Sequence, residues 1–122
     1  MQKAINLGFD EAEVFVAKGE ALLKIGNLEQ ASANFQLALS KKPDFTDGAL
    51  RMAVVCEKRN QLEEAKYWLE HAVTFNSESS IAYQFLGAIY LKLNDKVRAE
   101  AAFATSKSLI KMVSRQERNF YE

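Results

Sequence analysis

Small and large apolar residues return along this chain at a fixed interval of 34 residues. Within each copy these positions lie three or four residues apart, the spacing that places side chains on one face of an α-helix. The clearest columns pair a small residue with a large apolar one four positions later: Ala31, Ala65 and Ala99, then Phe35, Leu69 and Phe103. A second small-residue column, Gly19, Ala53 and Gly87, lies upstream. Each copy therefore predicts two amphipathic helices, and the interval is the register in which the copies stack.

The pattern predicts six helices, with capping residues at two of their starts. Asp10 and Glu13 form a capping-box arrangement before the first helix, and Ser77 or Ser79 can cap the fifth. The expected ranges are 11–25, 28–41, 45–59, 62–75, 79–93 and 96–111.

The C-terminal stretch KMVSRQERNFYE contains neither Gly nor Pro. It either prolongs the sixth helix or, with Ser114 and Glu117, begins a short capping helix. In both cases four apolar side chains are available to cover the last copy: Met112, Val113, Phe120 and Tyr121.

The stretch AEVFVAKGEALLKIGNLEQASANFQLALSKKP, from Ala12 to Pro43, resembles a unit of the tetratricopeptide repeat (TPR) family. That family is built from helix–turn–helix pairs of 34 residues. The resemblance implies an all-α fold, a right-handed α-α superhelix (TPR solenoid) of three helix–turn–helix repeats with a C-terminal helical extension. The third copy has Ser106 and Lys107 where Ala and an aliphatic residue are usual, so we expect its second helix to pack less tightly.

The expected organisation is three units between two short end segments. Residues 1–10 resemble the end of a preceding repeat, so the chain is interpreted as a possible segment of a longer array. The units themselves are residues 11–44, 45–78 and 79–112, and residues 113–122 form a capping or extension segment.

Composition excludes several function classes. The 16 Lys and Arg residues balance 16 Asp and Glu residues, so no net charge steers the chain toward nucleic acid or an anionic membrane. No run approaches the roughly 18 apolar residues of a membrane span, and the first residues lack the apolar region of a signal peptide. The sequence therefore predicts no nucleic-acid partner, no membrane insertion and a cytoplasmic location.

Reactive side chains are too few to predict catalysis. His71 is the one histidine, and we interpret it as a solvated residue on a second helix. Cys56 lies in a packed column, which favours a buried, inert thiol. There is no GxxxxGK[ST] or GxGxxG phosphate-binding motif. We expect no enzyme activity, no cofactor and no metal site.

The resemblance also implies a concave surface lined by the first helix of each unit. The third of these helices, IAYQFLGAIYLKL, is apolar nearly all round, so both of its faces need a cover. The implied lining residues are Glu13, Val16, Glu20, Leu23 and Lys24, then Asp47, Leu50, Val54, Glu57 and Lys58, then Ile81, Gln84, Phe85, Ala88, Leu91 and Lys92. Lys24, Lys58 and Lys92 either favour the helix dipole or form a ladder for acidic flanks of a ligand.

The main hypothesis for function is a non-catalytic interaction module that binds a peptide or amphipathic helix of a partner protein in this apolar groove. The alternatives are a homo-oligomer formed through the groove or the stack ends, a cover provided by the C-terminal tail, and the scaffold part of a longer multidomain protein. Scattered exposed apolar residues without any function are also common. Some TPR domains hold the C-terminal carboxylate of chaperones, but those positions here are Val16, Glu20, Arg51, Ile81 and Phe85, which predicts no chaperone carboxylate clamp.

Overall fold

The computed structural model describes the backbone of residues 10–121 and the side chains of residues 10–115. All regular structure in this part of the chain is α-helical. The expectation for residues 1–9, that they end a preceding repeat, lies outside the described residues. The helices are α2 (Glu11–Lys24), α3 (Leu28–Lys41), α4 (Thr46–Lys58), α5 (Leu62–Phe75), α6 (Ser80–Lys92) and α7 (Lys96–Tyr121).

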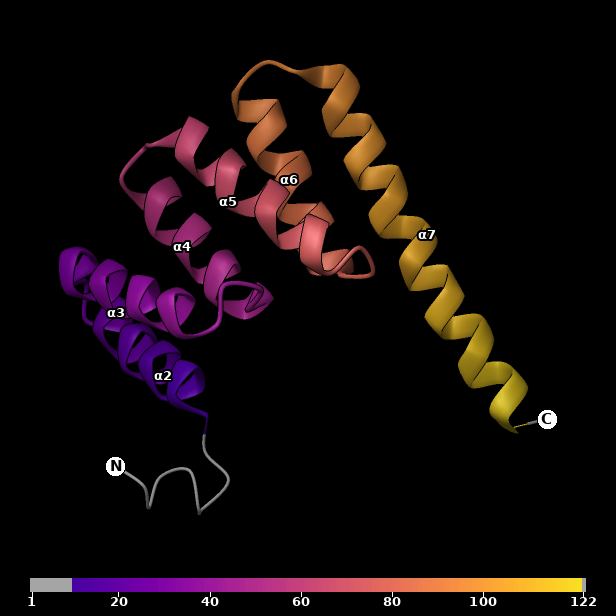
Figure 1. Ribbon diagram of the computed structural model, residues 1–122. Helices are drawn as coiled ribbons and strands as arrows, with labels where there is room; N and C mark the ends of the chain where they lie inside the picture. The colour runs from indigo at the N-terminus through magenta and orange to yellow at the C-terminus, as the bar shows by residue number, and fades with distance from the viewer. Residues whose placement is uncertain (1–9, 122) are drawn as a thin grey trace.

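Consecutive helices pair into three hairpins that stack in chain order (Figure 1). The first five helices begin and end within one residue of the predicted bounds. Asp10 caps α2 by accepting a hydrogen bond from the Ala12 N–H at 2.9 Å. Ser79, one of the two predicted candidates, caps α6 by accepting from the Ala82 N–H at 3.2 Å. The first and third hairpins therefore begin with a satisfied backbone donor.

The turn inside each hairpin contains a residue in the left-handed region, again at intervals of 34 residues. Gly26, Asn60 and Asn94 have φ values of 85°, 60° and 65°. Glycine and asparagine tolerate this conformation better than other residues do. The column of positive φ explains why the chain can reverse direction with only three residues between the paired helices.

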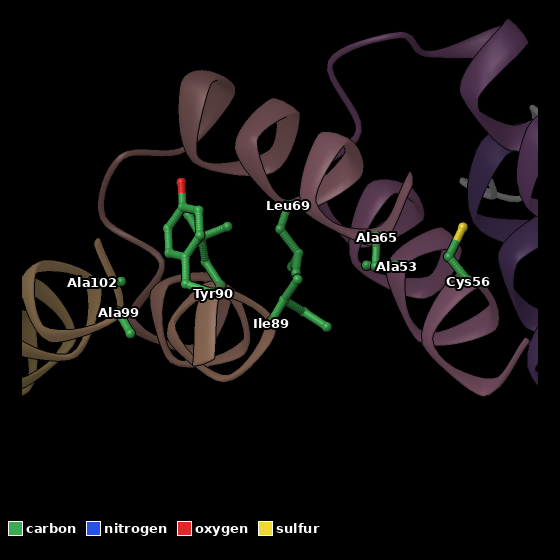
Figure 2. Packing of buried hydrophobic residues seen from close by; sticks show 9 residues of the cluster. Ala53, Cys56, Ala65, Leu69, Ile89, Tyr90, Ala99 and Ala102 are labelled. Carbon is green, nitrogen blue, oxygen red and sulfur yellow. The ribbon is translucent and has the colours of Figure 1, made fainter. Parts of the chain in front are cut away.

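The repeated columns form the core, as predicted, except that Phe103 is 36% exposed. Ala31, Ala65 and Ala99 are fully buried, and so are the large side chains of Phe35 and Leu69. Figure 2 shows Leu69 reaching from α5 toward Ile89 of α6. A continuous apolar core therefore links the second hairpin to the third.

Two glycines allow the helices of a hairpin to approach closely. A Cβ atom at Gly19 would lie 2.7 Å from Cδ1 of Phe35, and one at Gly87 would lie 2.7 Å from Cε1 of Phe103. Real Cβ atoms are not found at such distances from other carbon atoms, so a larger residue displaces the aromatic ring. The small-residue column is thus explained by an aromatic ring on the facing helix.

Helix α7 differs most from the predicted layout. It continues without a break to Tyr121 and passes through Ser114, so the alternative of a separate capping helix is wrong. Met112 and Val113 are 51% and 56% exposed, so they do not cover the last repeat. The side chains of Phe120 and Tyr121 lie outside the described residues.

The polar residue in the third unit's core is accommodated by a hydrogen bond. Ser106 is 3% exposed, and its Oγ donates to the backbone oxygen of Ser80 at 3.0 Å. This bond satisfies the hydroxyl and ties α7 to the first turn of α6.

Candidate functional site

A groove runs between α4 and α6, on the face formed by the first helices of the units. It has a volume of about 230 Å³, and a second hollow of about 240 Å³ continues it along α6. The two hollows share Ile81 and Phe85, so they form one surface, called here the inner groove. Its lining residues are Asp47, Leu50, Arg51, Val54, Ile81, Gln84, Phe85 and Ala88.

The inner groove is apolar along its centre. Ile81, Phe85 and Ala88 follow one another at the spacing of a helix face, and Leu50 and Val54 do the same on α4. Ile81 is 61% exposed, whereas Leu50 and Phe85 are partly buried because they also pack against the core below. The groove therefore combines a rigid apolar floor with one large side chain that is open to solvent.

The charged groups of this face pair with one another between neighbouring units. Nη2 of Arg51 on α4 forms an ion pair with Oε2 of Glu20 on α2 at 2.8 Å, and its Nε lies 3.5 Å from Oδ1 of Asp47. The Nε atom is shielded from solvent and has no hydrogen-bond partner within the described residues. Lys92 of α6 donates to Oε2 of Glu57 on α4 at 2.6 Å. These pairs compensate the charge around the groove and leave its apolar centre as the dominant feature.

Val16 does not line the groove, and that expectation is wrong. Its side chain is 4% exposed and belongs to a core cluster with Phe35 of α3 and with Met52 and Val55 of α4. The physical reason is its place in the stack, because α4 packs over this part of α2. The equivalent position one unit later, Leu50, is only partly buried, since less of the following hairpin covers it.

Most of the other predicted residues fall into two groups. Glu20, Glu57 and Lys92 form the ion pairs, and the groove itself contains Leu50, Val54, Ile81, Gln84, Phe85 and Ala88.

Four more lie outside the two hollows. Leu23 packs against the core, Leu91 is about half exposed, and Lys24 and Lys58 occupy the last turns of their helices. Arg51 also lines the groove, although the resemblance to the TPR family indicates it only as a clamp position. Its place next to Leu50 and four residues after Asp47 was the signal for it.

His71 lies at the surface but is partly buried, and it makes specific contacts that the sequence did not predict. Its Nε2 lies 2.9 Å from the backbone oxygen of Pro43, which fixes Nε2 as the donor. The ring also packs against Trp68 at 5.7 Å and Phe75 at 4.8 Å between centroids. The imidazole therefore connects α5 to the loop before α4.

Cys56 is a buried thiol, as predicted. It is 2% exposed, and burial, with Glu64 nearby, raises the pKa of the thiol above its usual value. A raised pKa lowers the fraction of thiolate and hence the reactivity. Among the described residues, no three His, Cys, Asp or Glu side chains gather to hold a metal ion. Nor does any helix in residues 10–121 have the length and apolar character needed to cross a membrane.

Comparisons with known proteins agree with this geometry. Residues 12–45 match the family model described as tetratricopeptide repeat. The first hairpin, formed by α2 and α3, is thus a tetratricopeptide repeat. RNA polymerase-associated protein CTR9 of Caenorhabditis elegans is 26% identical over 74 residues, which cover 61% of this chain and 6% of CTR9. The match thus spans only a small part of the length of CTR9.

Solved structures show the same TPR superhelix. The crystal structure of MamA matches 86% of this chain and 61% of its own chain, with a TM-score of 0.83 and 18% identity. The second TPR of Spaghetti (RPAP3), bound to the HSP90 peptide SRMEEVD, matches 89% of this chain and 99% of its own, with a TM-score of 0.79 and 19% identity. At these identities the likeness shows the all-α TPR fold.

Proposed function

We propose that this protein is a non-catalytic interaction module that binds a peptide or an amphipathic helix of a partner protein in the inner groove. The observation that carries the proposal is the continuous apolar surface from Leu50 to Ala88, which remains open beside compensated ion pairs. A TPR neighbour is bound to a peptide, which supports a polypeptide as the occupant. The proposal applies equally if this chain acts alone or if it is the scaffold part of a longer protein.

The chemistry of the groove favours a ligand with apolar anchors. Two helices each present a stripe at three- and four-residue spacing, so anchors at positions i, i+4 and i+7 of a ligand helix can follow the floor. Exposed Ile81 and partly buried Phe85 are its central contacts. Burying a large apolar side chain contributes about 2 kcal/mol, more than a solvent-exposed ion pair does.

An acidic C-terminal peptide is a poor ligand for this groove. Of the five clamp positions, only Arg51 carries positive charge, and Glu20 already engages it at 2.8 Å. Val16 is buried, and Ile81 and Phe85 offer no donor. The peptide SRMEEVD, which the RPAP3 domain holds, is therefore expected not to bind to this chain.

The test uses helical peptides selected from a display library on the full chain. We expect the selected peptides to share apolar anchors at helical spacing and to crosslink to a photoreactive residue at Gln84, which is exposed inside the groove. Ile81→Glu should lower their affinity by about tenfold or more, since it places a charge on the apolar floor. Leu37→Glu, at an exposed apolar position on α3 outside the groove, is the matched control.

Three results would contradict the proposal. They are selected peptides with no apolar spacing, equal affinity for the Ile81→Glu and Leu37→Glu variants, and binding of SRMEEVD in place of the selected helices. Thermal melts of both variants separate a lost contact from a lost fold.

A second candidate function is self-assembly through α7. Ile110 and Val113 are each more than half exposed and lie three residues apart, on one face of its projecting part. Two copies that pack these residues would form a symmetric contact. Sedimentation should then show a dimer that Ile110→Lys with Val113→Lys dissolves. A monomer at all concentrations, with peptide binding intact, would leave only the interaction module.

A further inference from the structure

A pocket of about 350 Å³, called here the outer pocket, lies on the opposite face of α6 from the inner groove. Its floor is formed by Tyr83, Leu86 and Tyr90 of α6. These residues are offset by half a turn from those of the inner groove, so the two surfaces do not overlap. One wall comes from α5 and the other from α7, and the pocket is open along its length.

Besides Arg98 at one end, the α7 wall is made of small side chains, namely Ala101, Ala102 and Thr105. The repeat interval gives each of them a counterpart one unit earlier. The residues 34 positions before them are Tyr67, Trp68 and His71. Large rings in the second unit are therefore replaced by two methyl groups and a threonine in the third.

In the earlier unit the rings of Trp68 and His71 occupy the corresponding space between α3 and α5, whereas Tyr67 is 59% exposed. Trp68 packs against the core clusters that contain Met52 and Ala49, the residues at the floor of that space. His71 closes one end by donating to the backbone oxygen of Pro43 at 2.9 Å. The molecule thus contains its own example of how this kind of groove is filled.

Larger residues on the floor of the outer pocket compensate only in part for the missing ring volume on α7. Tyr83 and Tyr90 stand where the earlier unit has Ala49 and Cys56. The Tyr90 hydroxyl donates to Oε2 of Glu70 at 2.8 Å, which holds the phenol against the α5 wall. Figure 2 shows Ala99 and Ala102 of α7 beside the Tyr90 side chain. The remaining volume falls within the range of small-ligand sites, about 300 to 1,000 Å³.

The polar groups of the pocket favour an occupant that donates a hydrogen bond. The Glu70 carboxylate has lone pairs beyond the one that Tyr90 uses. Arg98 also lines the pocket, but its Nε lies 3.6 Å from Oδ2 of Asp95, which compensates its charge. The remaining surface comes largely from Val73, Leu86 and the two alanines. A flat apolar ring with one N–H group matches this combination.

We propose that the outer pocket receives the indole side chain of a tryptophan on a partner polypeptide, the part that Trp68 plays within the chain one unit earlier. The open side of the pocket suits a side chain that remains attached to a backbone. A free small molecule of this size is usually enclosed over most of its surface. The site is separate from the inner groove and does not depend on the function proposed for it.

The test is a chemical-shift titration of the ¹⁵N-labelled full chain with four probes, one of which is free indole. N-acetyl-L-tryptophanamide should give saturable shifts around Val73, Leu86 and Thr105. Its 1-methyl analogue, which lacks the indole N–H, should bind about tenfold more weakly, the effect of one lost hydrogen bond. N-acetyl-L-leucinamide should give no saturable shifts.

Two variants and a control assign the binding to the pocket. Thr105→Trp places a ring at the position of His71 and should abolish probe binding. Ala104→Trp, at an exposed neighbouring position outside the pocket, should bind the probe as the unchanged chain does. Should Thr105→Trp lower the melting temperature, Ala101→Arg at the exposed rim gives the same answer with less change to the core.

Several outcomes would overturn the proposal. They are shifts centred on Ile81 and Phe85, equal affinity for the tryptophan and leucine probes, and unchanged binding in Thr105→Trp and Ala101→Arg. Free indole that binds more tightly than N-acetyl-L-tryptophanamide would assign the pocket to a small molecule instead of a polypeptide.

Discussion

The first and third hairpins use the same pair of residues in two different surroundings. In both, a glycine on the first helix faces an aromatic ring on the second: Gly19 with Phe35, and Gly87 with Phe103. Phe35 is fully buried, whereas Phe103 is 36% exposed, because no further hairpin packs against α7 within the described residues. The comparison shows that a hairpin's own sequence sets its internal contact, while the neighbouring hairpin determines how much that contact contributes to stability.

The largest expected difference is between the two phenylalanines. Phe35→Ala should lower the free energy of unfolding by about 4 kcal/mol, since it removes a buried ring and leaves a cavity. Phe103→Ala should cost about 2 kcal/mol, because part of the ring is already in water. Urea denaturation followed by circular dichroism measures both. Equal losses would show that the neighbouring hairpin has no such effect.

The glycines should repeat this ranking at smaller scale. Gly19→Ala forces a methyl group against a ring that cannot move, which costs about 2 kcal/mol net of the gain in helix propensity. At Gly87 the facing ring can rotate toward solvent, so the overlap and the propensity gain should nearly cancel. Thermal melts of the two alanine variants make the comparison. A Gly87 variant that is as unstable as the Gly19 variant would mean that Phe103 is held as firmly as Phe35.

A smaller effect on stability is expected at high pH, because the third hairpin has Tyr90 where the second has Cys56. Burial, together with the hydrogen bond to Glu70, raises the pKa of Tyr90 to about 12 from its usual value of 10.0. A raised pKa in the folded state favours the protonated form, so this stabilisation is complete below pH 10 and is lost between pH 10 and about 12. Unfolding free energies measured across that window should fall more steeply for the unchanged chain than for Tyr90→Phe. Parallel curves would show that Tyr90 ionises in the folded state as it does in the unfolded chain.

The smallest effects are expected at the ion pairs of the inner face. Glu57 and Lys92 are partly exposed and form an isolated ion pair. A double-mutant cycle with alanine should therefore give a coupling energy of about 0.5 kcal/mol. Arg51 interacts with both Glu20 and Asp47, so its coupling to Glu20 should be somewhat larger. High salt should weaken both couplings. A coupling at Glu57 and Lys92 above that at Glu20 and Arg51 would reverse the expected order.

The sequence predicted the fold well because each unit repeats the same local rules. Ala31, Phe35 and their counterparts occupy a register that only one stacking arrangement can bury. The helix ends followed from caps and turns, although the left-handed column of Gly26, Asn60 and Asn94 was not recognised. The continuation of α7 remained open, since a stretch without Gly or Pro does not distinguish a longer helix from a second short one.

The candidate site was harder to predict because burial depends on neighbours. Val16, Leu50 and Gln84 are equivalent in the repeat, yet they are buried, partly buried and exposed in that order. The sequence pattern of one repeat unit cannot predict this change in burial from unit to unit. The outer pocket was not predicted for a different reason. It exists because Ala102 is small where the preceding unit has Trp68. In the sequence, a small residue at such a position indicates only a close contact between helices.

Helix α7 has a mechanical consequence. Lys41 and Phe75 end their helices, and the chain then turns back, but at the equivalent Leu109 the helix continues for another twelve residues, to Tyr121. With a rise of 1.5 Å per residue, α7 is a strut about 39 Å long. Figure 1 shows it extending well past the hairpin from which it starts. A partner bound along the outer half of α7 would therefore be held at a fixed distance from the inner groove and the outer pocket.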